Sequence, residues 1–409
     1  MTTRPQAGRE AKIKVLDIIN TAASARELLL NRVRAINGDP RFENWVVCGP
    51  GRHTDALVKA GIRVHVIDSP PGVSLRYVSP SRTLSALIRL FLLIRREQFS
   101  IVHTHASVQG VIGRLAAWMA GVPVIIHTEH GSIFFDGQKT AATNLYMGME
   151  RFMARFTDHL LYQNPYELEY ARLHNLTAKA KVHFVGNGID LSHFDRRKTD
   201  EAKNDEPRGS QTARRQTIIV SVTRLDPIKN VGMLLRAADE LRGYRSDWEI
   251  RIVGNGLCRS ELERFVASRG LAPSVRFLGY RDDVPDVLAQ ADIAVLTSVK
   301  EGLPRGLMEP MAMGLPVVAT DVKGNRQVVV EGLCGFLVPL DDHVALAQRL
   351  MLLIDDLDLR RRMGRKAYQR ARESFDERNV IRSLLNIYRE ACVSSACLHA
   401  ETVSTVGLA

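Results

Sequence analysis

Four short motifs that mark common enzyme classes are absent from the 409-residue sequence. There is no G-x-x-x-x-G-K-[ST], no G-x-G-x-x-G, no H-E-x-x-H and no G-x-S-x-G. These motifs belong to P-loop nucleotide hydrolases, dinucleotide-dependent oxidoreductases, zinc peptidases and α/β-hydrolases, respectively. The sequence therefore gives none of these four classes its expected signature.

Cysteine pairs and long apolar runs are also missing. The five cysteines are scattered and include no C-x-x-C pair, so we expect reduced thiols and a cytoplasmic protein. The start of the chain lacks the apolar core of a signal peptide. The most apolar helical stretch, residues 84–97, is interrupted by Arg89, Arg95 and Arg96, whereas a membrane span needs about 20 apolar residues.

The excess of positive charge lies mainly in the first half of the chain. The net charge is +11; residues 1–190 hold 23 basic and 15 acidic residues, a difference of +8, and the remainder holds 33 and 30, a difference of +3. Aromatic residues make up 6% and are not interleaved with the basic ones, so nucleic acid is not the expected partner. An anionic membrane surface or a phosphorylated ligand agrees with this charge.

Short β-branched runs alternate with longer amphipathic stretches in two successive series. The first series begins near residue 13 and the second at TIIVSVTRL (217–225). Such repeats predict the α/β class, with two parallel sheets covered by helices on both faces. The predicted organisation is a domain over 1–190, a polar exposed linker over 191–216, a second domain over 217–375, a helix over 376–391 and a flexible tail over 392–409.

Two glutamates bracket a glycine-rich turn in EGLPRGLMEPMAMG, which begins at residue 301. The pattern places Glu301 before a helix that begins around Gly306 or Leu307, and Glu309 just inside that helix. Eight helical residues span roughly 12 Å, and a carboxyl pair in a glycosidase is roughly 5–10 Å apart. The spacing favours a clamp on two ends of a sugar–phosphate ligand, with phosphates over the helix N-terminus. Alternatively, Glu301 is a capping acid and Glu309 a solvated helix residue.

Two cations follow the first strand of the second series. In SVTRLDPIKN (221–230), the strand ends near Arg224, and a turn at Asp226 and Pro227 brings Lys229 beside it. Ligands of parallel sheets bind at the carboxyl ends of the strands, and a diphosphate suits two adjacent cations. Alternatively, both are ordinary surface charges.

Histidines cluster in the first half. His103 and His105 share one face of a predicted strand, and His127 and His130 close the next one. Four imidazoles in neighbouring loops could hold zinc, but polar residues at strand ends also line ligand crevices. We expect no metal site here.

The ordered set of motifs resembles the retaining glycosyltransferases of family four, which have the GT-B fold. In the second half the resemblance rests on VTRLDPIKN, IVGNG (252–256), the stretch from 301 to 322 and VEGLCGFLVPLDD. In the first half it rests on the histidine-containing stretch up to HTEHG and on VGNGIDLSHF. The likeness covers about residues 13 to 391, especially to bacterial members that build surface polysaccharides. It implies two Rossmann-like domains facing each other across a cleft, with the C-terminal helix returning to the first domain.

The resemblance also implies roles for individual residues. Glu309 would hold the nucleotide ribose, Arg224 and Lys229 would neutralise the diphosphate, and His130 would reach the donor sugar across the cleft. Gly254 matches a glycine that lets the nucleotide approach the backbone. The transferred sugar would be held by Glu301 and by the backbone of Gly302, Leu303, Pro304, Arg305, Gly306 and Leu307.

The sequence departs from the family pattern in two regions. Many members carry a Gly-Gly-x-Glu turn after the first strand, whereas this chain has TAASARE (21–27), with Arg26 about where the glutamate would be. Arg26, His103 and His105 are therefore acceptor-side candidates. Pro310 replaces the usual alanine after the second glutamate, and Lys323 and Gln327 replace a glycine and a glutamate. Pro310 withholds a backbone N–H, so it affects the pose of Glu309 unless it lies in the first turn.

The implied reaction transfers a sugar from a nucleoside diphosphate to a hydroxyl of a glycan or lipid-linked acceptor, with no cofactor and no metal. A UDP-sugar is the first expectation for the donor and GDP-mannose the second. The basic helix over 81–97 either rests on an anionic membrane or packs its apolar face on the sheet with its arginines in water. A nucleotide-sugar epimerase of the same fold and a non-catalytic sugar-nucleotide-binding relative are the alternatives.

Overall fold

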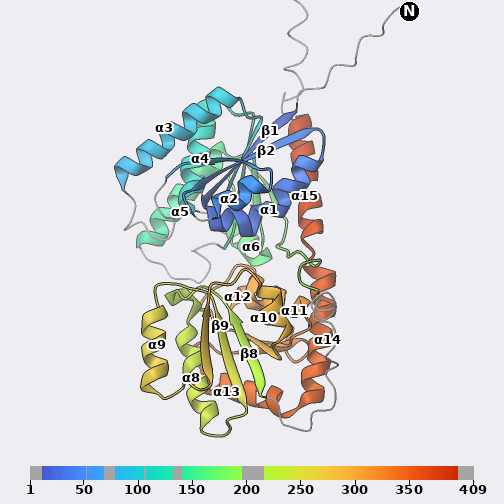
Figure 1. Cartoon of the computed structure of the whole chain (residues 1–409). Coiled ribbons are helices and arrows are strands. Elements are labelled where there is room, and N and C mark those ends of the chain that lie inside the picture. Colours follow the sequence, from blue (N-terminus) through green and yellow to red (C-terminus); the bar gives the residue numbers. More distant parts are fainter. Residues whose placement is uncertain are drawn as a thin grey trace, which may run out of the picture. The chain divides into compact units, whose positions relative to one another are not determined.

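The computed structural model describes residues 12–51, 53–68, 79–105, 107–131, 141–195 and 216–394. The chain divides into two compact units (Figure 1). The first unit comprises Met1–Val185 with Ile381–Ala409, and the second comprises Gly186–Val380. Each unit contains one parallel sheet, which confirms the predicted α/β class.

The sheet of the first unit has seven strands in the order β3-β2-β1-β4-β5-β6-β7. The strands are β1 (Ile13–Thr21), β2 (Phe42–Gly49), β3 (Arg63–Val66), β4 (Ile101–His105), β5 (Val124–Glu129), β6 (His159–Tyr162) and β7 (Lys181–Phe184). The helices are α1 (Ala22–Gly38), α2 (Thr54–Lys59), α3 (Pro80–Glu97), α4 (Ser107–Ala120), α5 (Ala141–Met153), the 3-10 turn η2 (Ala154–Phe156), α6 (Pro165–Leu173) and α15 (Glu377–Ser394).

Alternating side chains of β1 face two different helical layers. Leu16 and Ile18 pack in a core with α3 and α4, whereas Val15 packs in a core with α15. Helices α3 and α4 lie on one side of this sheet and α15 on the other (Figure 1). Asp17 is two residues from Val15, so its side chain points to the same face of the sheet. It therefore enters the layer beneath α1 and α15, although it is a charged residue in an otherwise apolar strand.

The second sheet has six strands in the order β10-β9-β8-β11-β12-β13. The strands are β8 (Thr217–Val222), β9 (Trp248–Val253), β10 (Val275–Gly279), β11 (Ile293–Leu296), β12 (Val317–Thr320) and β13 (Gly335–Val338). The helices are η3 (Pro227–Lys229), α8 (Val231–Arg242), α9 (Arg259–Ser268), α10 (Val284–Ala289), α11 (Arg305–Ala312), α12 (Lys323–Val328), α13 (His343–Asp355) and α14 (Leu357–Ser374).

Helix α11, which carries Glu309, begins at Arg305, directly after Pro304. Pro310 lies inside the helix, one residue after Glu309, and not in its first turn. The backbone N–H of Met313 still bonds to the carbonyl of Glu309, so the helix continues past the proline. Asp356 is the N-cap of α14, and Asp358 lies in its first turn.

The predicted linker and tail are wrong at their inner ends. Leu191 and Phe194 are buried and belong to the same core cluster as apolar side chains of α11 and α14 in the second unit. Cys392 is buried on α15, which continues to Ser394. Residues 196–215 and 395–409 lie outside the described part of the chain.

Both sheets reverse their strand order at one point. In the first sheet the order reverses between β1 and β4, and in the second between β8 and β11. In open parallel sheets, ligands bind beyond the carboxyl ends of the strands at such points. The two reversal points are therefore where a site is expected in each unit.

Helix α3 has a buried and an exposed apolar side. Leu90, Leu93 and Ile94 pack on the sheet, as one of the two sequence-based alternatives predicts. Leu84, Ile88 and Leu92, four residues apart, are nevertheless exposed. Among the described residues, no helix has the length and hydropathy needed to cross a bilayer.

Candidate functional site

The predicted donor-binding residues gather at the carboxyl edge of the second sheet. Arg224 and Lys229 follow β8, Gly254 follows β9, and Glu301 precedes α11 in the loop after β11. These three strands are neighbours in the sheet. The structure thus brings together residues that are far apart in the sequence, at the reversal point of the strand order.

Lys229 and Glu301 form an ion pair at this edge. The Lys229 ammonium donates to Glu301 Oε1 at 2.6 Å, and the Ser298 hydroxyl donates to the same oxygen at 2.6 Å. The two side chains are only 18% and 10% exposed. Sequence reasoning missed Ser298, because its role depends on the fold of the loop after β11.

Hydrogen bonds to backbone carbonyls hold together the two loops that carry this pair. The Thr297 hydroxyl donates to the carbonyl oxygens of Lys229 and Asn230, at 3.2 and 2.9 Å. The N–H of Val299 donates to the carbonyl of Ile228 at 2.9 Å. The ammonium and the carboxylate are therefore fixed in position before any ligand arrives.

Arg224 has a different environment. Its side chain is 66% exposed, and its Nε lies 3.3 Å from Asp226 Oδ2. An exposed pair of this kind is weak. The guanidinium is therefore able to turn toward an anionic ligand at small cost.

Glu309 lies on the first turns of α11, where it accepts a hydrogen bond from Arg305 Nε at 3.2 Å. Leu307 on the same helix is fully buried, and its backbone N–H donates to the carbonyl of Pro304 at 3.2 Å. The carbonyl of Leu303 accepts from the Asn187 amide at 3.0 Å, which ties down the loop before the helix.

Three glycines allow the loops of this edge to lie close together. Gly254 has a φ of +133°, and a Cβ there would lie 1.9 Å from the carbonyl oxygen of Thr223. A Cβ at Gly306 would lie 2.9 Å from the Val222 carbonyl, and one at Gly324 would lie 2.3 Å from the Glu301 carbonyl. Gly254 is thus required by the neighbouring backbone, whatever it also does for a nucleotide.

His103 and His105 lie in β4, His127 lies in β5 and His130 follows β5, toward the carboxyl edge of the first sheet and beside its reversal point. His130, just after β5, has its Nε2 2.9 Å from Nδ1 of His105. His105 Nε2 lies 2.9 Å from Oδ1 of Asp17. Arg32, from α1, donates to the same oxygen of Asp17, and the Asn44 amide donates to Oδ2 at 2.7 Å.

His103 and His127 do not join this chain. His103 lies between the hydroxyls of Tyr388 and Thr128, at 2.7 and 2.6 Å, and His127 bonds to the Thr104 hydroxyl at 2.8 Å. Both rings are buried. The four imidazoles therefore do not converge on one point as a zinc site would require.

Asp17, His103 and His105 are close enough together to be considered as metal ligands, since their donor atoms all lie within 4.8 Å. The Arg32 guanidinium, however, bonds to Asp17 and lies 2.9 Å from His105 Nε2. A fixed positive charge between two of the three donors opposes a second cation. This donor set does not fit a resident metal.

Burial keeps these histidines neutral. Burial, reinforced by the positive charge of Arg32, lowers the pKa of His130 to about 3, and a hydrogen bond with Gln163 opposes this shift. Burial, reinforced by Arg114, lowers the pKa of His127 to about 3. The pKa values of His103 and His105 are also well below their ordinary range, chiefly through burial.

The acceptor-side candidates occupy two different places. His103 and His105 have no exposed surface, so any effect of theirs on an acceptor would be indirect. Arg26 lies on the first turns of α1, with its Nη1 3.3 Å from His53 Nδ1. The Thr21 hydroxyl accepts from the Ser24 N–H and caps this helix, so the helix begins where the Gly-Gly-x-Glu turn of other members would be.

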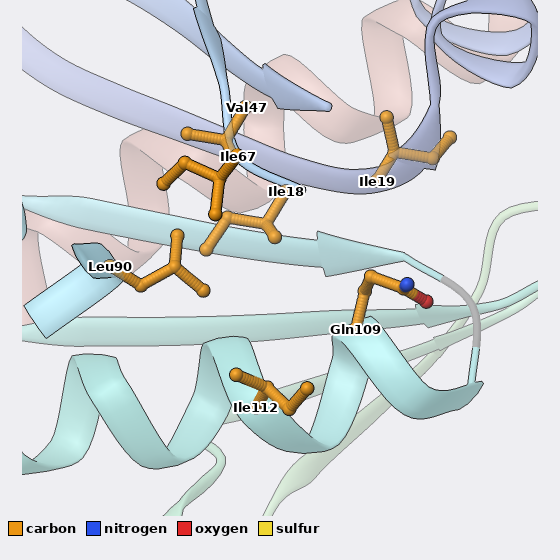
Figure 2. Close-up of a pocket in the computed structure, with 7 residues that line it drawn as sticks. All are labelled: Ile18, Ile19, Val47, Ile67, Leu90, Gln109 and Ile112. Atoms are coloured by element: carbon orange, nitrogen blue, oxygen red, sulfur yellow. The ribbon is translucent and has the colours of Figure 1, made fainter. Parts of the chain in front are cut away.

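A small pocket lies between the first sheet and helices α3 and α4 (Figure 2). Its lining is aliphatic except for Gln109 of α4. Ligand pockets commonly contain several convergent polar groups. This pocket is therefore not the candidate site. It is lined by Ile18, Ile19, Val47, Ile67, Leu90, Gln109 and Ile112.

Two family models match the chain. Residues 39–188 match the glycosyl transferase 4-like domain, and residues 202–370 match the glycosyl transferases group 1. A UDP-Gal:alpha-D-GlcNAc-diphosphoundecaprenol alpha-1,3-galactosyltransferase of Escherichia coli is 30% identical over 69% of this chain and 73% of its own length. The putative glycosyltransferase EpsD of Bacillus subtilis is 29% identical over 71% of this chain and 76% of its own length.

Solved structures show the same fold. The structure of Anabaena Alr3699/HepE in complex with UDP and glucose superposes with a TM-score of 0.75, over 92% of this chain and 99% of that one, at 19% identity. A sucrose-phosphate synthase from Thermosynechococcus elongatus superposes with a TM-score of 0.73, over 94% and 100%, at 18% identity. At such identities the likeness establishes the fold alone.

Proposed function

This chain belongs to the glycosyl transferases group 1, the retaining glycosyltransferases of family four, and on that premise we propose that it transfers a hexose from a UDP-sugar to a hydroxyl of a lipid-linked glycan. The 30%-identical relative is named for a UDP-galactose donor and a diphosphoundecaprenol-linked acceptor. That relative is the main support for this choice of substrates. GDP-mannose is the second choice of donor.

The charged edge of the second sheet supports a role in holding the donor. We assign the ribose hydroxyls to Glu309, since a carboxylate accepts hydrogen bonds from two vicinal hydroxyls. Arg224 and Lys229 would hold the diphosphate, with the N-terminus of α11 adding its positive dipole end. Glu301, already 2.6 Å from the Lys229 ammonium, would accept hydrogen bonds from the transferred sugar.

In the proposed reaction, the bond between the anomeric carbon and the diphosphate oxygen breaks, and its electron pair stays with the diphosphate. The acceptor oxygen forms a new bond to the same carbon on the same face, and its proton passes to the departing phosphate. Negative charge therefore grows on the phosphate in the transition state. Arg224 and Lys229 would stabilise it, and electrostatic stabilisation of this kind is usually the largest single contribution to catalysis.

These cations also lead us to propose that the transfer needs no metal ion. The two positive side chains and the helix N-terminus supply the charge that a divalent cation supplies in other nucleotide-dependent enzymes. We expect the same turnover rate in EDTA as in magnesium. A rate restored only by a divalent cation would contradict this part of the proposal.

We further propose that α3 rests on an anionic membrane surface. Leu84, Ile88 and Leu92 are 57%, 48% and 57% exposed, and they form one stripe along the helix. Exposed arginines flank the stripe, which is the composition of interfacial helices. This surface would bring the enzyme to a lipid-linked acceptor. The arginines are Arg82, Arg89, Arg95 and Arg96.

Co-sedimentation with vesicles tests the membrane surface. Ile88→Ser with Leu92→Ser should reduce binding to vesicles that contain phosphatidylglycerol, whereas Val58→Ser, at a similarly exposed apolar residue on α2, should not. Equal binding to anionic and purely zwitterionic vesicles would contradict the role of the arginines.

A thermal-shift panel with UDP, GDP, ADP and their sugars, in EDTA, tests the donor. A ligand at 100 times its dissociation constant should add about 2.7 kcal/mol to the free energy of unfolding of the domain that binds it. UDP should stabilise the wild type and not Glu309→Ala. Stabilisation by GDP alone would indicate a GDP-sugar as the donor. Stabilisation by none of these nucleotides would contradict the proposed donor site. Release of a rearranged sugar nucleotide without an acceptor would indicate an epimerase instead.

A further inference from the structure

A continuous chain of hydrogen-bonding groups leads from the interior of the first unit to His130. Asp17 and His105 are fully buried, and His130 is partly exposed. The two links, Asp17 Oδ1 to His105 Nε2 and His105 Nδ1 to His130 Nε2, are both 2.9 Å long. A buried carboxylate thus reaches a partly exposed imidazole through a second imidazole.

The carboxylate determines where the protons lie. The guanidinium of Arg32 donates to Oδ1 of Asp17 and the amide of Asn44 donates to Oδ2, so both oxygens act as hydrogen-bond acceptors. His105 Nε2, 2.9 Å from Asp17 Oδ1, then carries its proton toward the carboxylate. A neutral imidazole has a single N–H, so Nδ1 of His105 is an acceptor.

His130 must supply the proton of the second link. Its Nε2 therefore carries the proton and donates to His105 Nδ1, which leaves Nδ1 of His130 without a proton; the Gln163 side chain also hydrogen-bonds to this ring. Arg32 Nη2, also 2.9 Å from His105 Nε2, could donate to that nitrogen instead and reverse both links. The favoured direction is the one that avoids placing a carboxylate oxygen against an imidazole lone pair.

We propose that Asp17 and His105 are positioning residues that fix the tautomer and orientation of His130, so that its Nδ1 accepts a hydrogen bond from a substrate hydroxyl. The link to a substrate rests on the proposed glycosyl transfer, whereas the tautomer itself does not. His103 from β4, His127 from β5, Arg32 from α1 and Tyr388 from α15 are the other titratable groups around the chain.

A neutral ring in a single tautomer suits the proposed chemistry. The transition state of glycosyl transfer carries positive charge on the sugar ring, which a protonated histidine would oppose. The low pKa of His130 keeps the ring uncharged at neutral pH. An imidazole with no fixed partner would also lose orientation; partners behind metal-bound histidines are commonly worth about 10- to 100-fold in activity, and we expect a similar cost here.

Nuclear magnetic resonance of the full chain labelled with 15N-histidine tests the tautomer without any substrate. The His130 signals are assigned by their loss in His130→Asn. We expect the proton on Nε2 and a bare Nδ1 at neutral pH. A proton on Nδ1 would overturn the proposed direction of the chain.

A double-mutant cycle tests whether His105 acts through His130. His105→Phe should lower kcat about 10- to 100-fold and leave the KM for the donor and the binding of UDP unchanged. In a His130→Asn background the same change should cost nothing further. Equal, independent losses would show a merely structural role and overturn the proposal.

His103→Phe is the matched control. His103 is as deeply buried as His105 and its ring centroid lies 4.2 Å from that of His105, but its nitrogens bond to Tyr388 and Thr128. The His103→Phe variant should be less stable than the wild type, but the tautomer of His130 should not change. If the wild type transfers no sugar at all, the proposed function fails while the resonance experiment still decides the tautomer.

Discussion

The carboxyl edges of the two sheets have similar architecture and opposite chemistry. Each lies beside the point where the strand order reverses, between β1 and β4 in one unit and between β8 and β11 in the other. At the first edge the ionic pair of Asp17 and Arg32 is almost wholly buried, and neutral imidazoles lead outward from it. At the second edge the Arg224 side chain is 66% exposed, beside a largely buried ion pair of Lys229 and Glu301.

This difference indicates a division of labour. Fixed charges that remain accessible can bind a charged ligand, because the ligand replaces water and weak ion pairs. A buried carboxylate cannot touch a ligand, but it can fix a proton on its neighbour. The second unit is thus suited to hold a nucleotide diphosphate, and the first to orient one uncharged imidazole. The following experiments are ordered by the size of the effect expected on one edge and not on the other.

Replacing Lys229 should have the largest effect. Lys229→Ala removes the cation that we propose holds the leaving diphosphate, and it leaves the Glu301 carboxylate without its ammonium partner. We expect kcat/KM for the donor to fall about 10²- to 10³-fold. Steady-state kinetics measure this, with Arg236→Ala, a surface cation paired with Asp341 in the same unit, as the control. A loss below threefold for Lys229→Ala would remove this residue from the donor site.

Gly254→Ala should destabilise the second unit and not the first. The residue has a φ of +133°, and the new Cβ would overlap the Thr223 carbonyl. We expect a loss of about 2–4 kcal/mol, visible as an earlier urea-unfolding transition of that unit by hydrogen exchange. Gly232→Ala, in a helix with room for the Cβ, should be neutral or stabilising. A wild-type midpoint for Gly254→Ala would contradict the packing of these two loops.

Acid should affect the first unit before the second. The folded pKa of His127 is about 3 through burial, below its unfolded value of about 6.5. The unfolded chain therefore binds more protons, so the stability present above about pH 6.5 is lost as the pH falls toward 3. One such histidine lowers the free energy of unfolding by about 2 kcal/mol at pH 5.

Hydrogen exchange between pH 7 and pH 5 measures this difference. Strands β4 and β5 should lose protection, while β9 and β12 should keep it, since the two histidines of the second unit, His193 and His343, are not buried. Equal losses in both sheets would show that the buried histidines do not decide the acid response.

Ser298→Ala should have the smallest effect. It removes one hydrogen bond to Glu301 Oε1 and leaves the Lys229 ion pair. We expect a cost of about 1 kcal/mol, or about fivefold in kcat/KM. Thr297→Val is the control. It removes hydrogen bonds to the carbonyls of Lys229 and Asn230 but none to Glu301, so it reports the effect of loop order alone. A loss as large as that of Lys229→Ala would show that the hydroxyl has a further role.

The sequence predicts the two parallel sheets well, because β-branched runs and helical periodicity are local properties. It also predicts that Arg224 and Lys229 share one strand end, since they are five residues apart. The contact between Lys229 and Glu301 spans 72 residues and requires β8 to lie beside β11. Pattern alone does not provide that strand order.

Asp17 shows what sequence reasoning missed in the first unit. A charged residue in the apolar strand IKVLDIINT signals a buried partner. The identity of that partner depends on two further elements, since β1 pairs with β4 and α1 brings Arg32 back over the sheet. Leu191 and Phe194 were assigned to the linker for a related reason, because two apolar residues in a polar stretch do not show which core they join.

Calorimetric titration of UDP into the wild type, Glu309→Ala and His130→Asn, all in EDTA, tests the division of labour most directly. We predict one UDP site, an affinity at least about tenfold lower in Glu309→Ala, which is about 1.4 kcal/mol, and an unchanged affinity in His130→Asn, although that variant transfers sugar poorly. Unchanged UDP affinity in Glu309→Ala, or equal losses in both variants, would contradict the assignment of donor binding to the second unit and of the orienting imidazole to the first.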